Sequence, residues 1–240
     1  MSRRGTLLLG WALALAAMAA FAALGSWQLG RQREKQAMLD SARHVLARRG
    51  AVDLATAVRG IPGGFAWTQG SGRFAGGVRL LLDNQIRNGR PGIRLYCLFE
   101  PEGGTRPLLV DLGWLPLDGR RDLPQAACPR GVVDVRGLLV MPPSAGLHLG
   151  PPQKKIADDL WLATRIDTDS LGGAWRTVDE LSPHVLPLDP ALPFGYDRDL
   201  DILPNTLPPE RHLGYAVQWF ALAFAVLAIA LVLTFRKPRR

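Results

Sequence analysis

Two long stretches without a charged residue lie near opposite ends of the chain, over residues 5–30 and residues 213–235. A helix needs roughly 20 apolar residues to cross the hydrocarbon core of a bilayer, and both stretches are longer than this. The pattern therefore predicts two transmembrane helices, over residues 7–29 and residues 212–235.

The first apolar stretch also has features of an export signal, because Arg3 and Arg4 precede it. Two arginines before an apolar segment are found in cleavable signal peptides and in twin-arginine export signals. The apolar core is longer than the roughly 7–15 residues of a signal peptide, and Trp27 adds an interfacial aromatic residue at its far end. We therefore expect an uncleaved membrane anchor.

The loop between the spans, residues 30–211, is long enough to form one domain with its own core. Its first part, residues 33–49, has apolar residues at helical spacing, which predicts an amphipathic helix. Further along, short apolar or alternating runs bounded by Gly, Pro, Asn and Asp predict β-strands. The predicted strands cover residues 78–86, 93–100, 106–116, 131–141 and 159–166.

Turn signals define how these segments connect. Asn88 and Gly89 separate the first two predicted strands and form the strongest short signal for a hairpin, so these strands should pair antiparallel. Pro208 and Pro209 suit the first turn of the second long helix, where a missing amide hydrogen costs little.

The expected fold is an α+β membrane protein, with two transmembrane helices flanking a mainly antiparallel, barrel-like β domain.

Positive charge marks the short tails, residues 1–6 and 236–240, which hold six of the 29 Lys and Arg residues and no acid. Short positively charged segments remain on the cytoplasmic side of a membrane. We therefore expect both termini in the cytoplasm, residues 30–211 in the periplasm, and the protein in a bacterial plasma (inner) membrane. Three cations follow the first span on the translocated side, but long loops cross largely regardless of charge.

The charge balance of the loop argues against nucleic acid as a partner. Removing the six tail residues from 29 leaves 23 Lys and Arg against 21 Asp and Glu, a difference of only +2. A nucleic-acid-binding face needs clustered cations, commonly with stacking aromatic residues. The expected partner of the tails and spans is the lipid bilayer.

Motifs in the loop indicate no enzyme. Residues 70–77 contain four glycines but miss the GxGxxG spacing, which favours a turn or bulge between strands. Ser182 and His184 lack a GxSxG context. The remaining loop histidines, His44 and His148, are far apart in the sequence, which favours surface or hydrogen-bonded roles over metal binding.

The cysteines are Cys97 and Cys128, both in the loop. They would pair readily in an oxidising compartment, but they lack the CxxC spacing of a redox motif. The sequence leaves a disulfide and two separate thiols equally open.

A small polar group of residues is expected where the two spans meet the periplasm. Because the chain leaves through the first span and returns through the second, Trp27 and Gln28 lie level with His212, Tyr215 and Trp219. The last three residues have helical spacing and share one face of the second span. If this face turns towards the first span, it forms a polar site at the edge of the hydrocarbon.

Two interpretations of this group remain open on the residues alone. Aromatic residues at a membrane interface form an ordinary belt, and a histidine there can reach water, which is the more frequent case. Alternatively, His212 is a ligand, because a neutral imidazole offers a nitrogen lone pair to haem iron. The apolar helices would then hold the porphyrin, and Arg211 or Arg31 would meet its propionates.

Several segments of the chain carry a resemblance to a known family. They are "LGSWQLGRQREK", "LLDNQIRNGRPGIRLY", "LLVDLGWLP", "RGLLVMPPSAGLHLG", "DLWLATRID" and "RHLGYAVQWFALA". Together these segments resemble the SURF1 family, which consists of membrane proteins of cytochrome c oxidase biogenesis. They run in the family's order over nearly the whole chain.

The resemblance implies an assembly factor and not an enzyme. Bacterial relatives are associated with binding haem a and inserting it into oxidase subunit I, and haem a synthase is a further expected partner. The family's proposed haem ligand, a histidine of the second span, matches His212. Tyr215 and Trp219 match the YAxxWF part of the same motif, and Trp27 and Gln28 match the motif at the end of the first span.

Two alternatives to haem binding are weighed against it. A scaffold that stabilises an assembly intermediate of subunit I would use the same aromatic residues as a contact between helices. An anchored periplasmic enzyme would need a pocket in the β domain with perturbed acids or a nucleophile, and the loop indicates neither. A haem spectrum that depends on His212 separates the first alternative from haem binding.

Overall fold

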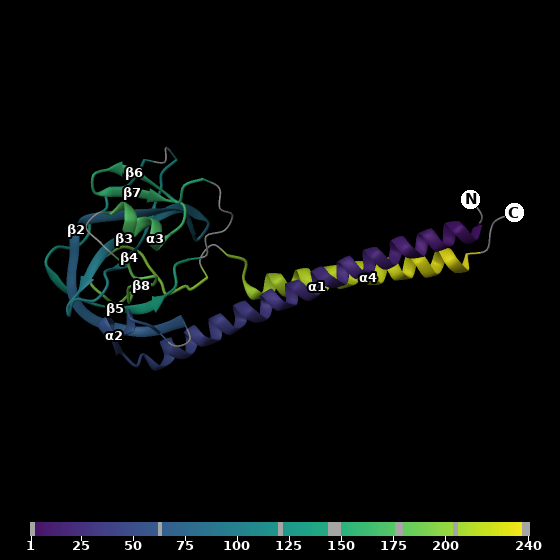
Figure 1. Ribbon diagram of the computed structural model, residues 1–240, viewed down its shortest axis with the longest axis horizontal. Helices are drawn as coiled ribbons and strands as arrows, with labels where there is room; N and C mark the ends of the chain where they lie inside the picture. Colours follow the sequence, from purple (N-terminus) through teal and green to yellow (C-terminus); the bar gives the residue numbers. More distant parts are fainter. Residues whose placement is uncertain are drawn as a thin grey trace. The chain divides into compact units, whose positions relative to one another are not determined.

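The computed structural model describes residues 3–61, 64–119, 122–143, 150–175, 180–203 and 206–236. Contacts within the chain divide it into two compact units. The helix-pair unit comprises Met1–Leu39 and Leu207–Arg240, and the sheet unit comprises Asp40–Thr206. Figure 1 labels most elements of both units.

Two long helices, α1 (Arg3–Arg48) and α4 (Pro209–Phe235), carry the apolar stretches. Both are long and apolar enough to cross a membrane. The amphipathic helix predicted over residues 33–49 is the uninterrupted continuation of α1. The start of α4 at Pro209 confirms the prediction from the proline pair.

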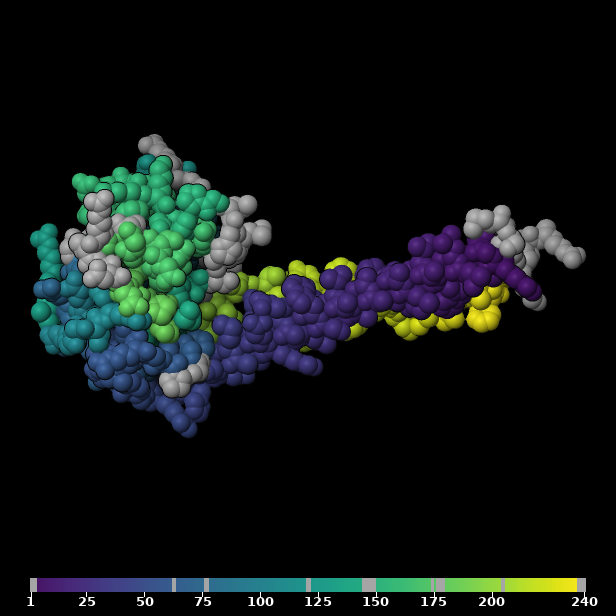
Figure 2. Space-filling view, in the orientation of Figure 1, coloured from purple at the N-terminus to yellow at the C-terminus, as the bar shows by residue number. Residues whose placement is uncertain are grey.

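Within the helix-pair unit, α1 and α4 lie side by side and antiparallel (Figures 1 and 2). Three contacts define their register: Trp11 with Thr234, Phe21 with Trp219, and Gln28 with His212. Gly25 lets the helices approach, because a Cβ atom at this position would lie 2.8 Å from the ring of Phe220.

The sheet unit has eight strands and two short helices among its described residues. The strands are β1 (Val52–Asp53), β2 (Phe65–Arg87), β3 (Arg90–Pro101), β4 (Leu108–Pro116), β5 (Val132–Val140), β6 (Gln153–Ala157), β7 (Leu160–Ala163) and β8 (Val185–Pro187). The helices are α2 (Leu54–Ala57) and α3 (Thr168–Ala174).

The strands form one mixed sheet. Its order is β3-β4-β8-β5-β2-β7-β6, and a further pairing joins β2 to β3, so the pairings run in a circuit from β3 back to itself. The β1–β2, β2–β7 and β4–β8 pairings are parallel, and the β2–β3, β2–β5, β3–β4, β5–β8 and β6–β7 pairings are antiparallel. That this sheet closes into a barrel stays a prediction.

The glycine-rich segment at residues 70–77 was expected to be a turn or bulge between two strands, but it does not separate two strands. It lies inside β2, which is 23 residues long. The pairing of β2 with β3 shifts register between Phe74 and Arg79, where a bulge bends the long strand. Gly72 is needed for close packing, because a Cβ atom there would lie 2.3 Å from the backbone oxygen of Glu100.

Both faces of the sheet are buried. Side chains of successive strand residues point to opposite faces, so Leu80 and Leu82 pack in one core while Leu81 packs in another. In β3, Leu95 belongs to the core of Leu81, and Tyr96 belongs to the core of Leu80. This explains why the sequence shows continuous apolar runs there and no simple alternation.

Two local features of the sheet unit resolve sequence-based expectations. Asn88 and Gly89 have φ angles of 51° and 73°, as a tight hairpin turn requires, and the flanking strands β2 and β3 pair antiparallel. The predicted hairpin is thus confirmed. Cys97 and Cys128, whose state the sequence left open, form a disulfide with a Cα–Cα distance of 6.0 Å.

Candidate functional site

His212 is buried in the helix-pair unit near the start of α4, with 7% of its surface exposed. Its Nδ1 atom lies 2.7 Å from Oε1 of Gln28 on α1. An amide oxygen can accept but not donate a hydrogen bond, so Nδ1 carries the proton and donates it to Gln28. In the neutral imidazole with this tautomer, the other ring nitrogen, Nε2, is unprotonated and keeps its lone pair.

The Nε2 atom of His212 is buried and has no hydrogen-bond partner among the described residues. Leaving a buried acceptor unpaired costs on the order of 1–3 kcal/mol. Buried polar atoms are mostly paired in folded proteins. Four other buried side-chain atoms of the described residues also lack a partner, in Thr105, Gln153, Trp175 and His184, but all four lie in the sheet unit, and Nε2 of His212 is the one that lies in the helix pair. The geometry of this nitrogen suits a metal ligand, since its partner nitrogen is already held in place.

The surroundings of His212 are apolar and aromatic. Ala216, one turn further along α4, is 1% exposed. Trp219, one more turn along, stacks on Phe21 of α1 with ring centroids 5.7 Å apart. His212, Ala216 and Trp219 follow the i, i+4, i+7 spacing of a helix face, and this face of α4 contacts α1.

Three predicted site residues lie outside this contact. Trp27 is 57% exposed and Tyr215 is 40% exposed, and Arg211 is exposed as well. A helix turns by about 100° per residue, which carries Trp27 away from the face that holds Gln28. The structure thus brings Gln28, His212 and Trp219 to the helix contact and leaves Trp27, Tyr215 and Arg211 on its outer surface.

Sequence reasoning missed a charged residue of this contact, Lys35. It is 7% exposed, and its Nζ atom donates a hydrogen bond of 2.6 Å to the backbone oxygen of Leu207, just before α4. Phe21, Gln28 and Lys35 recur every seven residues along α1 and so share one face. This spacing was the available signal for Lys35.

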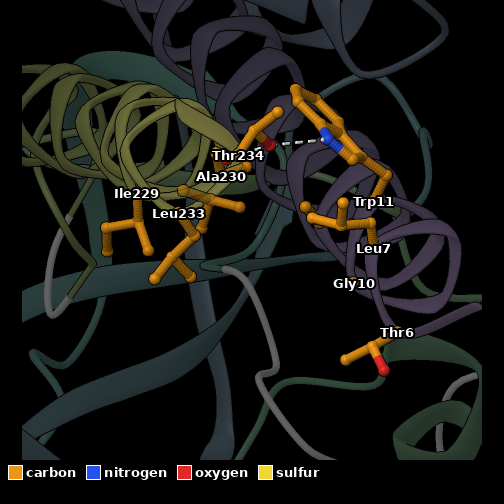
Figure 3. Close-up of a pocket in the computed structure, with 10 residues that line it drawn as sticks. Thr6, Leu7, Gly10, Trp11, Ile229, Ala230, Leu233 and Thr234 are labelled. Carbon is orange, nitrogen blue, oxygen red and sulfur yellow. Dashed lines mark hydrogen bonds between the residues drawn. The ribbon is translucent and has the colours of Figure 1, made fainter. Parts of the chain in front are cut away.

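A separate apolar pocket lies towards the other end of the helix pair (Figure 3). Its volume is about 450 Å³, and it is lined by Thr6, Leu7, Gly10, Trp11, Ala14, Val226, Ile229, Ala230, Leu233 and Thr234. Trp11 donates from Nε1 to Oγ1 of Thr234 at 3.0 Å, which joins the two helices beside the pocket. Val226 lies about 21 Å along α4 from His212, at 1.5 Å per residue, so this pocket is distinct from the His212 site.

The sheet unit contains a buried ion pair, which has a structural role. Arg94 on β3 lies 2.5 Å from Asp111 on β4, and their side chains are 8% and 1% exposed. Although burial by itself lowers the pKa of Arg94, the neighbouring charge of Asp111 raises this pKa above its ordinary value overall. Asp111 also accepts from the backbone N–H of Gly113 at 2.9 Å. Arg94 also lies 3.4 Å from Asp199, so both side chains of the buried pair have partners within the fold.

His44 and His184, the other histidines that the structure describes, do not gather into a metal site. His44 is exposed, and His148 lies outside the described residues. His184 is partly buried, and its burial lowers its pKa below the ordinary value. In the parts of the chain that the structure describes, no group of three or more His, Cys, Asp or Glu side chains is arranged to hold a metal ion.

Comparison with known families decides the family of this chain. The model of the SURF1 family matches residues 15–224, which include Gln28, Lys35 and His212. The chain belongs to the SURF1 family. Membership in the SURF1 family implies a role in cytochrome c oxidase assembly, and the family consists of assembly factors and not of known enzymes. The comparison with curated proteins found no match.

Proposed function

We propose that this SURF1-family protein binds haem a through His212 and assists its insertion into subunit I of cytochrome c oxidase. The observation that carries the proposal is the Nε2 atom of His212, which is buried, unprotonated and without a partner among the described residues. Haem iron is a metal that takes such an imidazole nitrogen as an axial ligand.

The proposal includes a topology. The positively charged tails lie in the cytoplasm and the sheet unit lies in the periplasm of a bacterial inner membrane, so His212 lies at the periplasmic edge of the bilayer. Subunit I is the receiving partner, and haem a synthase is the expected donor. The bilayer surrounds α1 and α4, which suits an apolar cargo that is passed between membrane proteins.

Each residue of the site has a distinct task in this proposal. His212 coordinates the iron, and Gln28 holds the imidazole by its other nitrogen, which fixes both the tautomer and the ring orientation. Trp219, stacked on Phe21, closes the helix contact next to the ligand. Trp27 and Tyr215 offer exposed aromatic surface close to the site, where a porphyrin or subunit I can pack.

The test is a spectrum of the purified full-length protein. Protein from cells that make haem a should show the absorption of bound haem a, and protein from otherwise identical cells without haem a synthase should not. A colourless preparation from the first cells would overturn the proposal and favour a scaffold that holds a subunit I intermediate without haem.

Gln28→Leu is expected to weaken haem a binding by about 10- to 100-fold, the usual effect of removing a residue that orients a metal ligand. The reason is that leucine cannot accept the Nδ1–H of His212, so the ring loses its fixed tautomer and orientation. Titration of the apo-protein with haem a in detergent measures the dissociation constant, and the visible spectrum reports the iron coordination.

The matched variant for this prediction is Gln28→Glu, which keeps an acceptor oxygen at the same place. It should retain most of the affinity and the wild-type spectrum. Equal weakening by leucine and glutamate would show that Gln28 acts through packing of the helices and does not position the ligand.

A further inference from the structure

Lys35 is a buried cation of the helix-pair unit that forms no ion pair with a described residue. Its side chain is 7% exposed, and its one hydrogen bond to a described residue goes to the backbone oxygen of Leu207. A lysine ammonium group has three N–H donors, so two of them remain for other acceptors.

No carboxylate among the described residues pairs with Lys35. Glu34, its neighbour in sequence, binds Arg31 instead, at an Nη1–Oε2 distance of 2.6 Å. A buried charge is costly unless an opposite charge compensates it. The nearby charge of Glu34 favours the charged form of Lys35 less than burial and Arg31 disfavour it. The positive charge of Lys35 therefore indicates an anionic partner outside α1 and α4.

The missing partner can be located relative to His212. Lys35 and Gln28 share one face of α1 and are two turns apart, which is about 10 Å along the helix axis. Leu207, the hydrogen-bond partner of Lys35, lies two residues before the start of α4 at Pro209. Lys35 and Arg31 are also the cations that act electrostatically on His212. The ammonium group therefore lies beside the His212 site, on the side away from the apolar part of the helices.

We propose that Lys35 binds a carboxylate of the ligand that His212 coordinates. This inference rests on the proposed function and names the class of ligand: a metal-bearing, amphipathic molecule with carboxylates at one edge. In haem a, that edge carries the two propionates. Lys35 is thus a further binding residue of the haem a site.

This contact would set the orientation of the bound haem. An ammonium–carboxylate hydrogen bond is charge-assisted and therefore stronger than a neutral one. A ligand held at both His212 and Lys35 would turn its carboxylate edge towards the polar end of the helix pair. The protein would in this way present haem a to its partner in one defined orientation.

The experiment compares haem a with haem a dimethyl ester, in which both propionates are uncharged. Both probes are titrated into full-length apo-protein in detergent, using the wild type, Lys35→Met and Arg43→Gln. Wild type should bind haem a at least about tenfold more tightly than the ester, the effect expected for one hydrogen bond to a charged group. Lys35→Met should lose this difference while binding the ester as the wild type does. The control Arg43→Gln, which alters an exposed cation of α1 already paired with Asp40, should keep the difference.

The outcomes separate the two proposals. Equal affinity of the wild type for haem a and its ester overturns the role of Lys35, even if Lys35→Met fails to fold. An unchanged difference in Lys35→Met also overturns it, and would assign the ammonium group to another anion such as a lipid phosphate. In both cases haem binding through His212 stands. Failure of the wild type to bind either probe overturns the proposed function itself.

Discussion

Purified His212→Ala protein is expected to be colourless under conditions in which the wild type carries haem a. Alanine removes the nitrogen that we assign as the iron ligand. The helix pair retains its other contacts, including the stacking of Phe21 on Trp219 and the hydrogen bond from Trp11 to Thr234. Absorption spectra of equal amounts of both proteins, isolated from cells that make haem a, measure the effect.

The control for this variant is His44→Ala, which removes an exposed histidine from α1. It should leave the haem content unchanged. Added imidazole should restore part of the absorption to His212→Ala, because the space left by the side chain admits a free ligand of the same chemistry. Haem content equal to that of the wild type in His212→Ala would rule out this residue as the ligand.

Asp111→Ala is expected to destabilise the sheet unit by about 3–5 kcal/mol, the usual cost of removing one partner of a buried ion pair. The variant leaves Arg94 charged and 8% exposed, without the carboxylate that lies 2.5 Å from it in the wild type, and with only the partly exposed Asp199, 3.4 Å away, as a counter-charge. For a domain of this size, such a loss lowers the unfolding midpoint by roughly 6–20 °C. Thermal unfolding of the full-length protein in detergent, followed by tryptophan fluorescence, measures the shift.

Two variants complete this test. Arg73→Ala breaks the ion pair with Glu100, in which the arginine side chain is 71% exposed, so it should cost no more than about 1 kcal/mol. The double variant Arg94→Met with Asp111→Leu should be more stable than Asp111→Ala, because it leaves no uncompensated charge in the interior. If Asp111→Ala and Arg73→Ala unfolded at the same temperature, the buried pair would contribute no more to stability than the exposed pair does.

The central strands and the hairpin were predictable because their signals are local. The apolar run at Leu80–Leu82 and the Asn88–Gly89 turn define β2 and β3 without reference to distant residues. The first part of β2, before residue 78, was not predicted, nor were β1, β6 and β8. β6 is mostly exposed and polar, and β1 and β8 have two and three residues. Their strand character comes from partners elsewhere in the chain: β6 pairs with β7, and β8 with β4 and β5.

The sequence predicted which residues of the two long helices lie at the same level, but not which of their side chains face the other helix. A chain that leaves and returns through two adjacent spans must bring the end of one level with the start of the other, and Gln28 does contact His212. Which side chains face inward depends on how each helix is turned about its own axis. Trp27 and Tyr215, expected as walls of the site, are exposed for this reason.

The sequence by itself determined the two apolar helices, the central strands with their hairpin and the histidine at the start of the second span, because each depends on residues close together in the chain. The tertiary structure decided the mixed sheet order, the disulfide, the pairing of Gln28 with His212 and the burial of Lys35. These features join residues that are far apart in sequence. Their geometry follows from packing, which no local pattern encodes.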